Sequence, residues 1–335
     1  MPDDSPLAFL TGGTGFVGSH LAEELLARGY RVRALVRSSP KWLEGLDVER
    51  VTGDLHDADA LAAGVDGADA VYHVAGLTRA RDQATLDAAN VDGTVRLLDA
   101  VRQHAPDVRK VLVTSSLEAM GPNRLAPDGA ALPAIEVTPP EPVSMYGRSK
   151  ARMERVVRDR FADLPVVIVR PPAVYGPREA DIFEMVKGAS RGLFAVVGRS
   201  DVPRLSLVHV RDLVRGMADL AESDATAGET YFVGTRGYSW DEVRASMERA
   251  LGRRTRRLAV PPALIGLAGA LAEGAGRVTG SLPPLTRDKA EAAKHAWICA
   301  SSKAEAAVGY APRVGLGEGM AETVAWYREN GWLDG

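Results

Sequence analysis

The sequence contains one cysteine, Cys299, in 335 residues, which excludes an internal disulfide and any metal cluster held by several thiolates. Charge of one sign is not in excess either, because 41 lysines and arginines oppose 44 aspartates and glutamates for a formal net charge of −3. Without a basic field, nucleic-acid binding is not expected. No apolar run approaches the roughly 20 residues that span a bilayer, and residues 1–6 have no basic segment typical of a secretory signal. We therefore expect a cytoplasmic protein without stable membrane insertion.

Glycine, in contrast, is concentrated where the chain begins. Residues 7–11 form an apolar run of strand length, a glycine cluster follows, and apolar residues at helical spacing come next. In such a strand–turn–helix unit, glycines permit the tight turn, the approach of a pyrophosphate to the backbone and the close packing of helix on strand. Two spacings fit, Gly13-x-Gly15-x-x-Gly18 and Gly12-x-x-Gly15-x-x-Gly18. The helix start would hold the phosphates of a dinucleotide, which predicts cofactor contacts at Gly12, Thr14, Gly15, Phe16 and Val17.

Apolar strand-like segments alternate with helical patterns through the first half of the chain. Segments of this type cover residues 31–36, 48–51, 70–76, 110–114 and 165–170. Such alternation predicts an α/β fold with a doubly wound parallel sheet of the Rossmann type. We place this dinucleotide-binding core at residues 1–172, with later contributions near 205–233. Residues 173–335 would form mainly a smaller, mixed α/β region that binds substrate.

Two segments stand apart from this alternation. Residues 122–142 are rich in proline, alanine and glycine without a regular period, which predicts an active-site flap. Residues 261–280 are apolar and contain several glycines, but they are too short to span a bilayer. We expect close packing or the wall of an apolar substrate pocket there. A membrane-surface anchor would need a basic polar face, which this segment lacks.

The end of the second predicted strand bears on the choice of cofactor. A dinucleotide fold that prefers NAD places an acidic residue there to hold the ribose 2′-hydroxyl. This chain has Arg37, Ser38 and nearby Lys41 instead, and cations with hydroxyls suit a 2′-phosphate. NADP(H) is therefore favoured, with NAD(H) as the alternative. After the third strand, Asp54 and its neighbour Leu55 would contact the adenine, unless Asp54 caps the next helix.

Tyr146 and Lys150 lie four residues apart at the start of a helical pattern, so they share one face of that helix. A phenol with a pKa near 10 exchanges protons poorly at neutral pH, but a neighbouring ammonium and the positive nicotinamide ring of an oxidised cofactor would favour the phenolate and lower that pKa. Ser116 follows a strand end, where ligands bind in an open parallel sheet. We expect these three residues to be catalytic. Cofactor contacts are also predicted for Tyr146 and Lys150 and for Val74, Ala75, Gly76, Thr114, Pro171 and Val174.

These motifs together resemble the extended short-chain dehydrogenase/reductases, also called the NAD-dependent epimerase/dehydratase group. The resemblance runs nearly the whole length of the chain and is closest to 3β-hydroxysteroid dehydrogenase-like and dihydroflavonol 4-reductase-like members. It implies that Tyr146 exchanges a proton with the substrate oxygen, that Lys150 holds the nicotinamide ribose, and that Ser116 orients the substrate. It assigns Asn90 to a proton relay, although Asn90 could equally kink a helix. It also implies a homodimer that pairs through the helices near 85–104 and 146–161.

Glu118 occupies the position where sugar-nucleotide dehydratases of this group carry an acid. Its neighbour is Leu117, where those enzymes have an aspartate, so the pair needed for elimination is incomplete. We therefore interpret Glu118 as structural and do not expect dehydration. His73 and His209 have no further ligand at metal spacing in the sequence, so we expect packed, hydrogen-bonded histidines and no metal.

The leading hypothesis is an NADP(H)-dependent oxidoreductase that interconverts a ketone and a secondary alcohol on a largely apolar small molecule. A nucleotide-sugar epimerase is the alternative, with cations for a pyrophosphate available at Arg178, Arg199, Arg204 and Arg211. A dinucleotide-binding sensor or assembly factor without catalysis is a third hypothesis, since fold alone does not determine function. Retention of all three residues of the catalytic type weighs against this third hypothesis.

Overall fold

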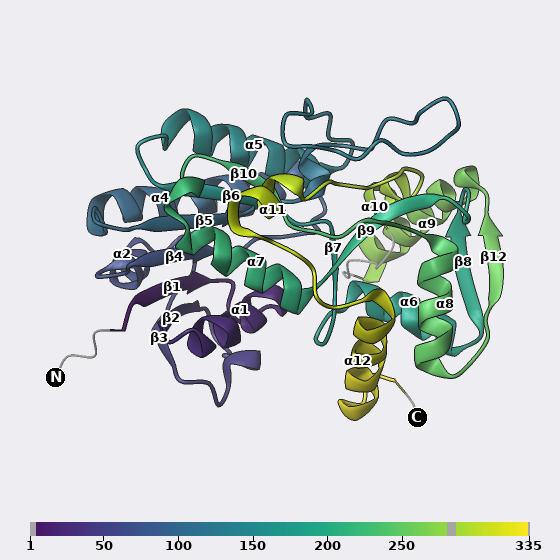
Figure 1. Cartoon of the computed structure of the whole chain (residues 1–335), viewed down its shortest axis with the longest axis horizontal. Helices are drawn as coiled ribbons and strands as arrows, with labels where there is room; N and C mark the ends of the chain where they lie inside the picture. The colour runs from purple at the N-terminus through teal and green to yellow at the C-terminus, as the bar shows by residue number, and fades with distance from the viewer. Residues whose placement is uncertain (1–4, 280–285, 334–335) are drawn as a thin grey trace.

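The structure, a computed structural model, describes residues 5–279 and 286–333. Figure 1 shows a central sheet flanked by helices on one side of the molecule, with a smaller region of short strands and helices on the other. The N-terminal half of the chain builds most of the central sheet, and the C-terminal third builds most of the smaller region.

The central sheet has seven parallel strands in the order β10-β6-β5-β4-β1-β2-β3. The order reverses beside β1, between β2 on one side and β4 on the other, and a crevice at such a reversal is where ligands bind in open α/β sheets. This confirms the predicted doubly wound Rossmann-type sheet. The strands are β1 (Leu7–Thr11), β2 (Arg31–Val36), β3 (Val48–Thr52), β4 (Ala70–His73), β5 (Lys110–Thr114), β6 (Val166–Arg170) and β10 (Thr230–Phe232).

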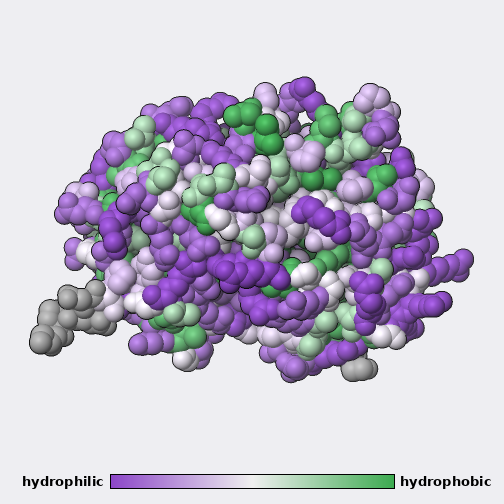
Figure 2. All heavy atoms as spheres, in the orientation of Figure 1, coloured by the Kyte–Doolittle hydropathy of each residue, from purple (hydrophilic) through white to green (hydrophobic). Residues whose placement is uncertain are grey.

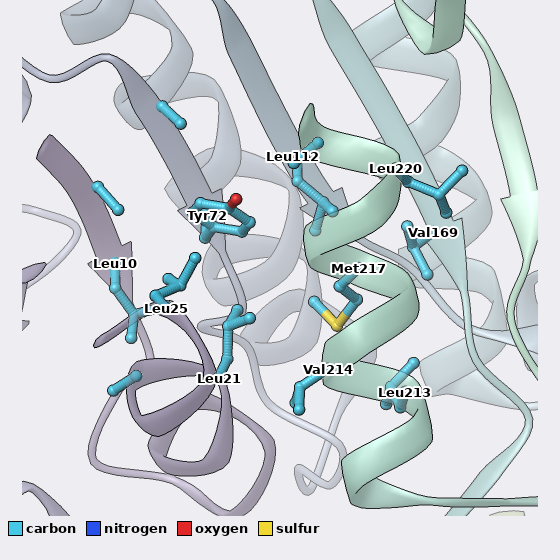
Figure 3. Packing of buried hydrophobic residues seen from close by; sticks show 14 of the residues in the cluster. Leu10, Leu21, Leu25, Tyr72, Leu112, Val169, Leu213, Val214, Met217 and Leu220 are labelled. Carbon is cyan, nitrogen blue, oxygen red and sulfur yellow. The ribbon is translucent and has the colours of Figure 1, made fainter. Parts of the chain in front are cut away.

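Both faces of the sheet are covered by helices, because successive side chains of a strand point to opposite faces. On one face, Tyr72, Leu112 and Val169 pack against α1 (Phe16–Ala27) and α7 (Val210–Glu222), as Figure 3 shows. The other face carries α2 (Ala58–Val65), α3 (Gln83–Asp87), α4 (Gly93–His104) and α5 (Met145–Arg160). The two buried clusters hold the carboxyl ends of the strands in fixed positions.

The smaller region begins where prolines end β6 and the chain leaves the central sheet. A three-stranded sheet in the order β11-β9-β7 and a parallel pair of β8 and β12 form its strands. The strands are β7 (Ala173–Tyr175), β8 (Leu193–Val197), β9 (Pro203–His209), β11 (Gly237–Ser239) and β12 (Arg256–Val260). The helices are α6 (Asp181–Ser190), α8 (Trp240–Leu251), α9 (Pro262–Thr279), α10 (Arg287–Ala292) and α12 (Leu316–Glu329). Helix α11 (Ser302–Val308) instead packs beside α7 and β10 of the central sheet.

Residues 122–142 contain no helix or named strand, as the sequence predicts. The segment is nevertheless tied to the chain near residue 298. The amide of Ala134 donates to the carbonyl of Ile298 at 2.8 Å, and the side chain of Asn123 bonds to the same residue. Hydrophobic atoms gather at the top of Figure 2, over this loop, where Leu125, Leu132, Ile135 and Val137 are exposed.

Two sequence predictions need correction. Asp54 does not cap α2, because Asp57 caps it by accepting a hydrogen bond from the amide of Ala60 at 3.0 Å. The carboxylate of Asp54 instead accepts a bond from the amide of His56, which closes a local turn. Of the contributions to the core predicted near 205–233, α7 packs on the central sheet and β10 joins it, but β9 does not, since it pairs with β7 and β11. Within the described residues, no helix has the length and apolar character required to cross a membrane.

Candidate active site

The glycine turn after β1 has no room for side chains at two positions. Gly12 has φ +77°, and a Cβ there would lie 2.5 Å from the amide nitrogen of Ala75. A Cβ at Gly18 would lie 2.2 Å from the carbonyl oxygen of Gly12. At Gly13 the nearest atoms are side-chain carbons, 3.2 Å or more away. Of the two spacings in the sequence, the structure therefore requires the one that begins at Gly12.

The surroundings of this turn fit the phosphates of a dinucleotide. Helix α1 begins at Phe16, and none of the described side chains caps its N-terminus, so its first N–H groups and the positive end of its dipole remain available to an anion. Thr14, Gly15 and Val17 lie within the same turn and first helical residues. Across the crevice, the hydroxyl of Thr114 is buried without a hydrogen-bond partner among the described residues. A buried polar atom of this kind is usually satisfied by a ligand or water.

The strand ends beside the turn bring two further predicted residues close to it. The amides of Val74 and Ala75 donate to the backbone and side-chain oxygens of Thr11, at 3.2 and 3.4 Å. Gly76 then passes so close to the interior that a Cβ would lie 2.8 Å from Oδ1 of Asn90 and 3.4 Å from Nζ of Lys150. The absence of a side chain at Gly76 therefore allows the backbone after β4 to pass close to Asn90 and Lys150.

The end of β2 leaves its cations unpaired. Arg37 and Ser38 are exposed, and neither side chain is bonded to any residue within 5–279 or 286–333. Lys41 is also exposed and has φ +48°. Free cations at this strand end are what a 2′-phosphate would require. The side chain of Leu55 packs against Gly93 of α4. Of the two residues predicted to contact the adenine, only Asp54 has a polar side chain that could bind it.

Helix α5 carries the predicted catalytic pair. The hydroxyl of Ser144 caps the helix by accepting a bond from the amide of Gly147 at 2.9 Å. One turn further, the ammonium of Lys150 is buried and donates to the carbonyl of Thr114 at 2.7 Å. Burial lowers the pKa of Lys150 to about 8. The structure thus joins the catalytic helix to the end of β5 through Lys150.

Tyr146 differs from the sequence prediction in its electrostatics. Burial and the charge of Glu118 raise the pKa of Tyr146, and a side-chain hydrogen bond with Ser116 lowers it by less. The sequence predicts a lowered pKa from two positive charges, the Lys150 ammonium and the nicotinamide ring of an oxidised cofactor. In the protein without cofactor, burial outweighs the lowering interaction, so the predicted shift would require the cofactor charge. The interaction with Ser116 indicates that the two side chains lie close together.

Asn90 lies in a π-helical turn, Ala88–Asp92, between α3 and α4. Its side chain accepts from the amide of Leu77 at 2.8 Å and donates to the carbonyl of Leu77 and to Oγ of Ser149, both at 2.9 Å. The Ser149 hydroxyl in turn donates to the carbonyl of Tyr146. π-turns are frequent at functional sites. Both interpretations of Asn90 from the sequence, the helix irregularity and the link to the catalytic helix, are therefore compatible with its place in the structure.

Glu118 and Asp288 fix the beginning of α5 from two sides. The Ser144 hydroxyl donates to Oε2 of Glu118 at 2.6 Å, and burial raises the pKa of Glu118. Asp288, from α10, accepts the amide of Met145 on both carboxylate oxygens, at 2.8 and 2.9 Å. The sequence analysis did not identify Asp288, since nothing in the sequence relates it to a residue 143 positions away.

A set of charged groups lies beside Glu118 on α6 and α10. Lys289 pairs with Asp181 at 2.9 Å, and Arg79 approaches the same carboxylate at 3.9 Å. Lys289 and Asp181 both act electrostatically on Glu118. These groups join the loop after β4 to the helices of the smaller region at the edge of the site.

The predicted cofactor-contact residues after β6, Pro171 and Val174, lie at the edge of the candidate site or outside it. Pro171 accepts a bond at its carbonyl from the amide of Leu117 at 2.9 Å, which positions the segment that contains Ser116. Val174 belongs to β7 and pairs with Val208 in the smaller sheet. Ser115, next to the predicted catalytic serine, is fully buried and donates to Glu154 at 2.5 Å, within the buried Glu154–Arg170 ion pair.

The two strand histidines are packed as the sequence predicts. His73 forms hydrogen bonds with the hydroxyls of Thr11 and Thr94 at 2.7 and 2.8 Å, and burial lowers its pKa to about 3. His209 caps α7, and burial lowers its pKa to about 4. Neither belongs to a cluster of three potential metal ligands among the described residues.

Residues 8–234 match the NAD dependent epimerase/dehydratase family. The chain is 33% identical over 328 residues to the ceramide reductase of Caulobacter vibrioides, covering 97% of this chain and 95% of that protein. It is 35% identical over 268 residues to sterol demethylase protein B of Methylococcus capsulatus, covering 76% and 78%. The crystal structure of gox2253 matches with a TM-score of 0.79 and 29% identity, over 99% of this chain and 100% of that chain. The protein therefore belongs to the NAD-dependent epimerase/dehydratase family.

Proposed function

We propose that this protein is an NADP(H)-dependent oxidoreductase that interconverts a ketone and a secondary alcohol on a largely apolar substrate, of the hydroxysteroid or dihydroflavonol type. The observation that carries the proposal is the convergence of Ser116, Tyr146 and Lys150 beside the side-chain-free passage at Gly76. The names of relatives support an apolar substrate, since those proteins are described as acting on a ceramide, a sterol and a farnesylated quinoline.

The bound nicotinamide would supply or accept hydride, and its positive ring in the oxidised form would favour the phenolate. The chain's residues then have simple tasks. Ser116 holds the substrate oxygen, and Tyr146 gives it a proton in reduction or removes one in oxidation. Lys150 is held by the Thr114 carbonyl at a fixed distance from the crevice, where it can bind the ribose hydroxyls. The preference for NADP(H) rests on the free Arg37 and Ser38 at the end of β2.

The alternative, a nucleotide-sugar epimerase, needs free cations for a pyrophosphate. Three of the four candidate arginines are already paired with carboxylates: Arg178 with Glu23, Arg199 with Asp201, and Arg211 with Glu322. This pairing weighs against the epimerase and in favour of an apolar substrate. A homodimer through α4 and α5 remains a prediction.

A screen of apolar ketones and secondary alcohols with NADPH, NADH and their oxidised forms tests the proposal through nicotinamide absorbance. We expect substrate-dependent turnover that Tyr146→Phe reduces by about a hundredfold or more. Dinucleotide binding, measured by fluorescence titration, should stay within about twofold because the phenol does not touch the phosphates. Tyr310→Phe is the matched control, since its hydroxyl is buried elsewhere.

Full activity of Tyr146→Phe would refute the mechanism. Interconversion of UDP-sugars by a tightly held dinucleotide, without net nicotinamide turnover, would establish the epimerase instead. A protein that binds NADPH but turns over none of these substrates would favour the sensor hypothesis.

A further inference from the structure

Residues 250–272 form an unusual stretch in a chain with a net negative charge. They contain four arginines, at positions 253, 254, 256 and 257, and no aspartate or glutamate. Most of the other residues in the stretch are apolar. The sequence analysis considered the segment from residue 261 onward alone and found no basic face there. The structure shows that the charges lie in and just before β12, the strand that leads directly into α9.

Helix α9 has two different sides. A Cβ at Gly269 would lie 2.9 Å from the carbonyl oxygen of Thr286, so this side of α9 packs closely on the start of α10. The predicted close packing is confirmed at Gly269, whereas a Cβ at Gly266 would meet only Nζ of Lys294, at 4.0 Å. At 3.6 residues per turn, three leucines cluster within an arc of about 60° on the opposite side. Those leucines are Leu264, Leu267 and Leu271, with exposures of 55%, 57% and 66%.

Strand β12, which leads into α9 through Pro261, and its partner β8 also carry exposed apolar and basic groups. Leu258 of β12 and Leu193 of β8 are both more than half exposed, and Leu193 lies opposite Arg256 in the register. Among the described residues, none of the four arginines is in an ion pair with a carboxylate. Arg253 donates to the carbonyl of Ser190, and Arg257 donates to the hydroxyl of Ser200. Arg254 and Arg257 act electrostatically on Glu248 and Asp201, whereas no such carboxylate partner is seen for Arg253 and Arg256 among the described residues.

We propose that β12 and the outer side of α9 form a docking surface for an anionic phospholipid bilayer. Exposed leucines beside unpaired arginines match the two components of such an interface, acyl chains and phosphate headgroups. A second copy of this chain is a poorer occupant, because a twofold contact would place the four arginines of one copy against those of the other. The four arginines therefore favour an anionic bilayer over a second copy of this chain as the occupant of the surface.

Helix α9 is linked by packing and hydrogen bonds, through α10, to the start of α5. Gly269 holds α9 against α10, and Asp288 of α10 accepts the amide of Met145, which precedes Tyr146. Docking itself does not depend on the proposed reaction, and it can be measured without substrate or cofactor.

Flotation of the full chain with vesicles tests the proposal. One set contains phosphatidylcholine with phosphatidylglycerol, and the other contains phosphatidylcholine alone. We expect binding to the anionic set that weakens as salt is added, and little binding to the neutral set. The triple variants Leu264→Gln/Leu267→Gln/Leu271→Gln and Arg253→Ala/Arg254→Ala/Arg256→Ala should each bind at least about tenfold more weakly. Arg31→Ala/Arg109→Ala is the matched control. Both arginines are exposed, and they lie at the start of β2 and just before β5 in the central sheet, outside the proposed docking surface.

Thermal melting by circular dichroism tests whether each variant keeps its fold. We expect that it does, because all the substituted side chains are exposed. Failure of the unaltered chain to float with anionic vesicles would overturn the proposal. Equal binding by the leucine variant and the unaltered chain would also overturn it. If light scattering shows that the leucine variant dissociates a dimer, then the surface joins two copies and the bilayer proposal is wrong.

Discussion

The amide of Met145 donates to both carboxylate oxygens of Asp288, at 2.8 and 2.9 Å. This contact joins α10, from the last part of the chain, to the residue that precedes Tyr146. A carboxylate at the beginning of a helix also interacts favourably with the helix dipole. The smaller region therefore takes part in positioning the start of α5, the helix that carries Tyr146.

Removal of this contact should affect catalysis more than cofactor binding. In Asp288→Ala the Met145 amide loses an ionised acceptor, a bond that contributes about 1.5–3 kcal/mol. We expect kcat/KM to fall about tenfold or more, with dinucleotide affinity unchanged and partial recovery in Asp288→Asn, which retains one acceptor. Glu248→Ala is the control, because it removes a carboxylate that accepts the Thr255 amide away from the site. Equal kinetics in Asp288→Ala and the unaltered enzyme would show that α10 does not position Tyr146.

Arg37 should decide between the two cofactors. Its guanidinium is free at the end of β2, where the 2′-phosphate of NADPH would lie. Arg37→Ala should raise the KM for NADPH about tenfold or more and leave the KM for NADH within about twofold. Arg31→Ala, at the other end of the same strand, should change neither constant. An equal effect of Arg37→Ala on both cofactors would remove the basis for the NADP(H) preference.

Alanine substitutions at Gly12 and Gly45 distinguish the effect of backbone strain from the effect of a steric clash. Both have left-handed backbones, with φ +77° and +79°, but only Gly12 has atoms close to a would-be Cβ. Gly45→Ala should therefore lower the free energy of unfolding by about 1 kcal/mol through strain alone. Gly12→Ala should lower it further and abolish dinucleotide binding, because Ala75 must move. Urea denaturation and fluorescence titration measure the two effects, and similar results for both variants would contradict the assigned role of Gly12.

His73 should make the protein sensitive to acid. Burial lowers its pKa to about 3, whereas in the unfolded chain it titrates near its usual 6.5. Between these values the unfolded state binds more protons, so the stabilisation is complete above about pH 6.5 and is lost as the pH falls toward 3. His73→Gln should be less stable at pH 7, because two hydrogen bonds change, but its unfolding midpoint should fall less between pH 7 and 5.

The exposed His104 provides the comparison, since His104→Gln should leave the pH dependence of unfolding as it is. Urea midpoints at several pH values report these differences. An unaltered slope in His73→Gln would mean that His73 is not the group that titrates.

The nucleotide-binding turn and the Tyr146–Lys150 pair could be predicted from the sequence because they depend on neighbours along the chain. Strand length, glycine spacing and helical period act within about 20 residues. The direction of the Tyr146 pKa could not be predicted this way. It depends on how completely the fold excludes water from the phenol and on Glu118, which arrives from another strand end. Likewise, the cap of α2 went to Asp57 rather than Asp54 because backbone geometry selects among nearby acids.

The sequence by itself determined the doubly wound parallel fold, the glycine turn and the placement of Tyr146 and Lys150 on one helix, because each is encoded in a local pattern of residue size and polarity. Only the tertiary structure brought Asp288 to the start of α5, paired three of the four arginines offered for a pyrophosphate, and left the leucines on one side of α9 exposed. Those relationships join residues that are far apart in the chain or lie on particular sides of an element. Their proximity follows from packing and topology, which no short stretch of sequence contains.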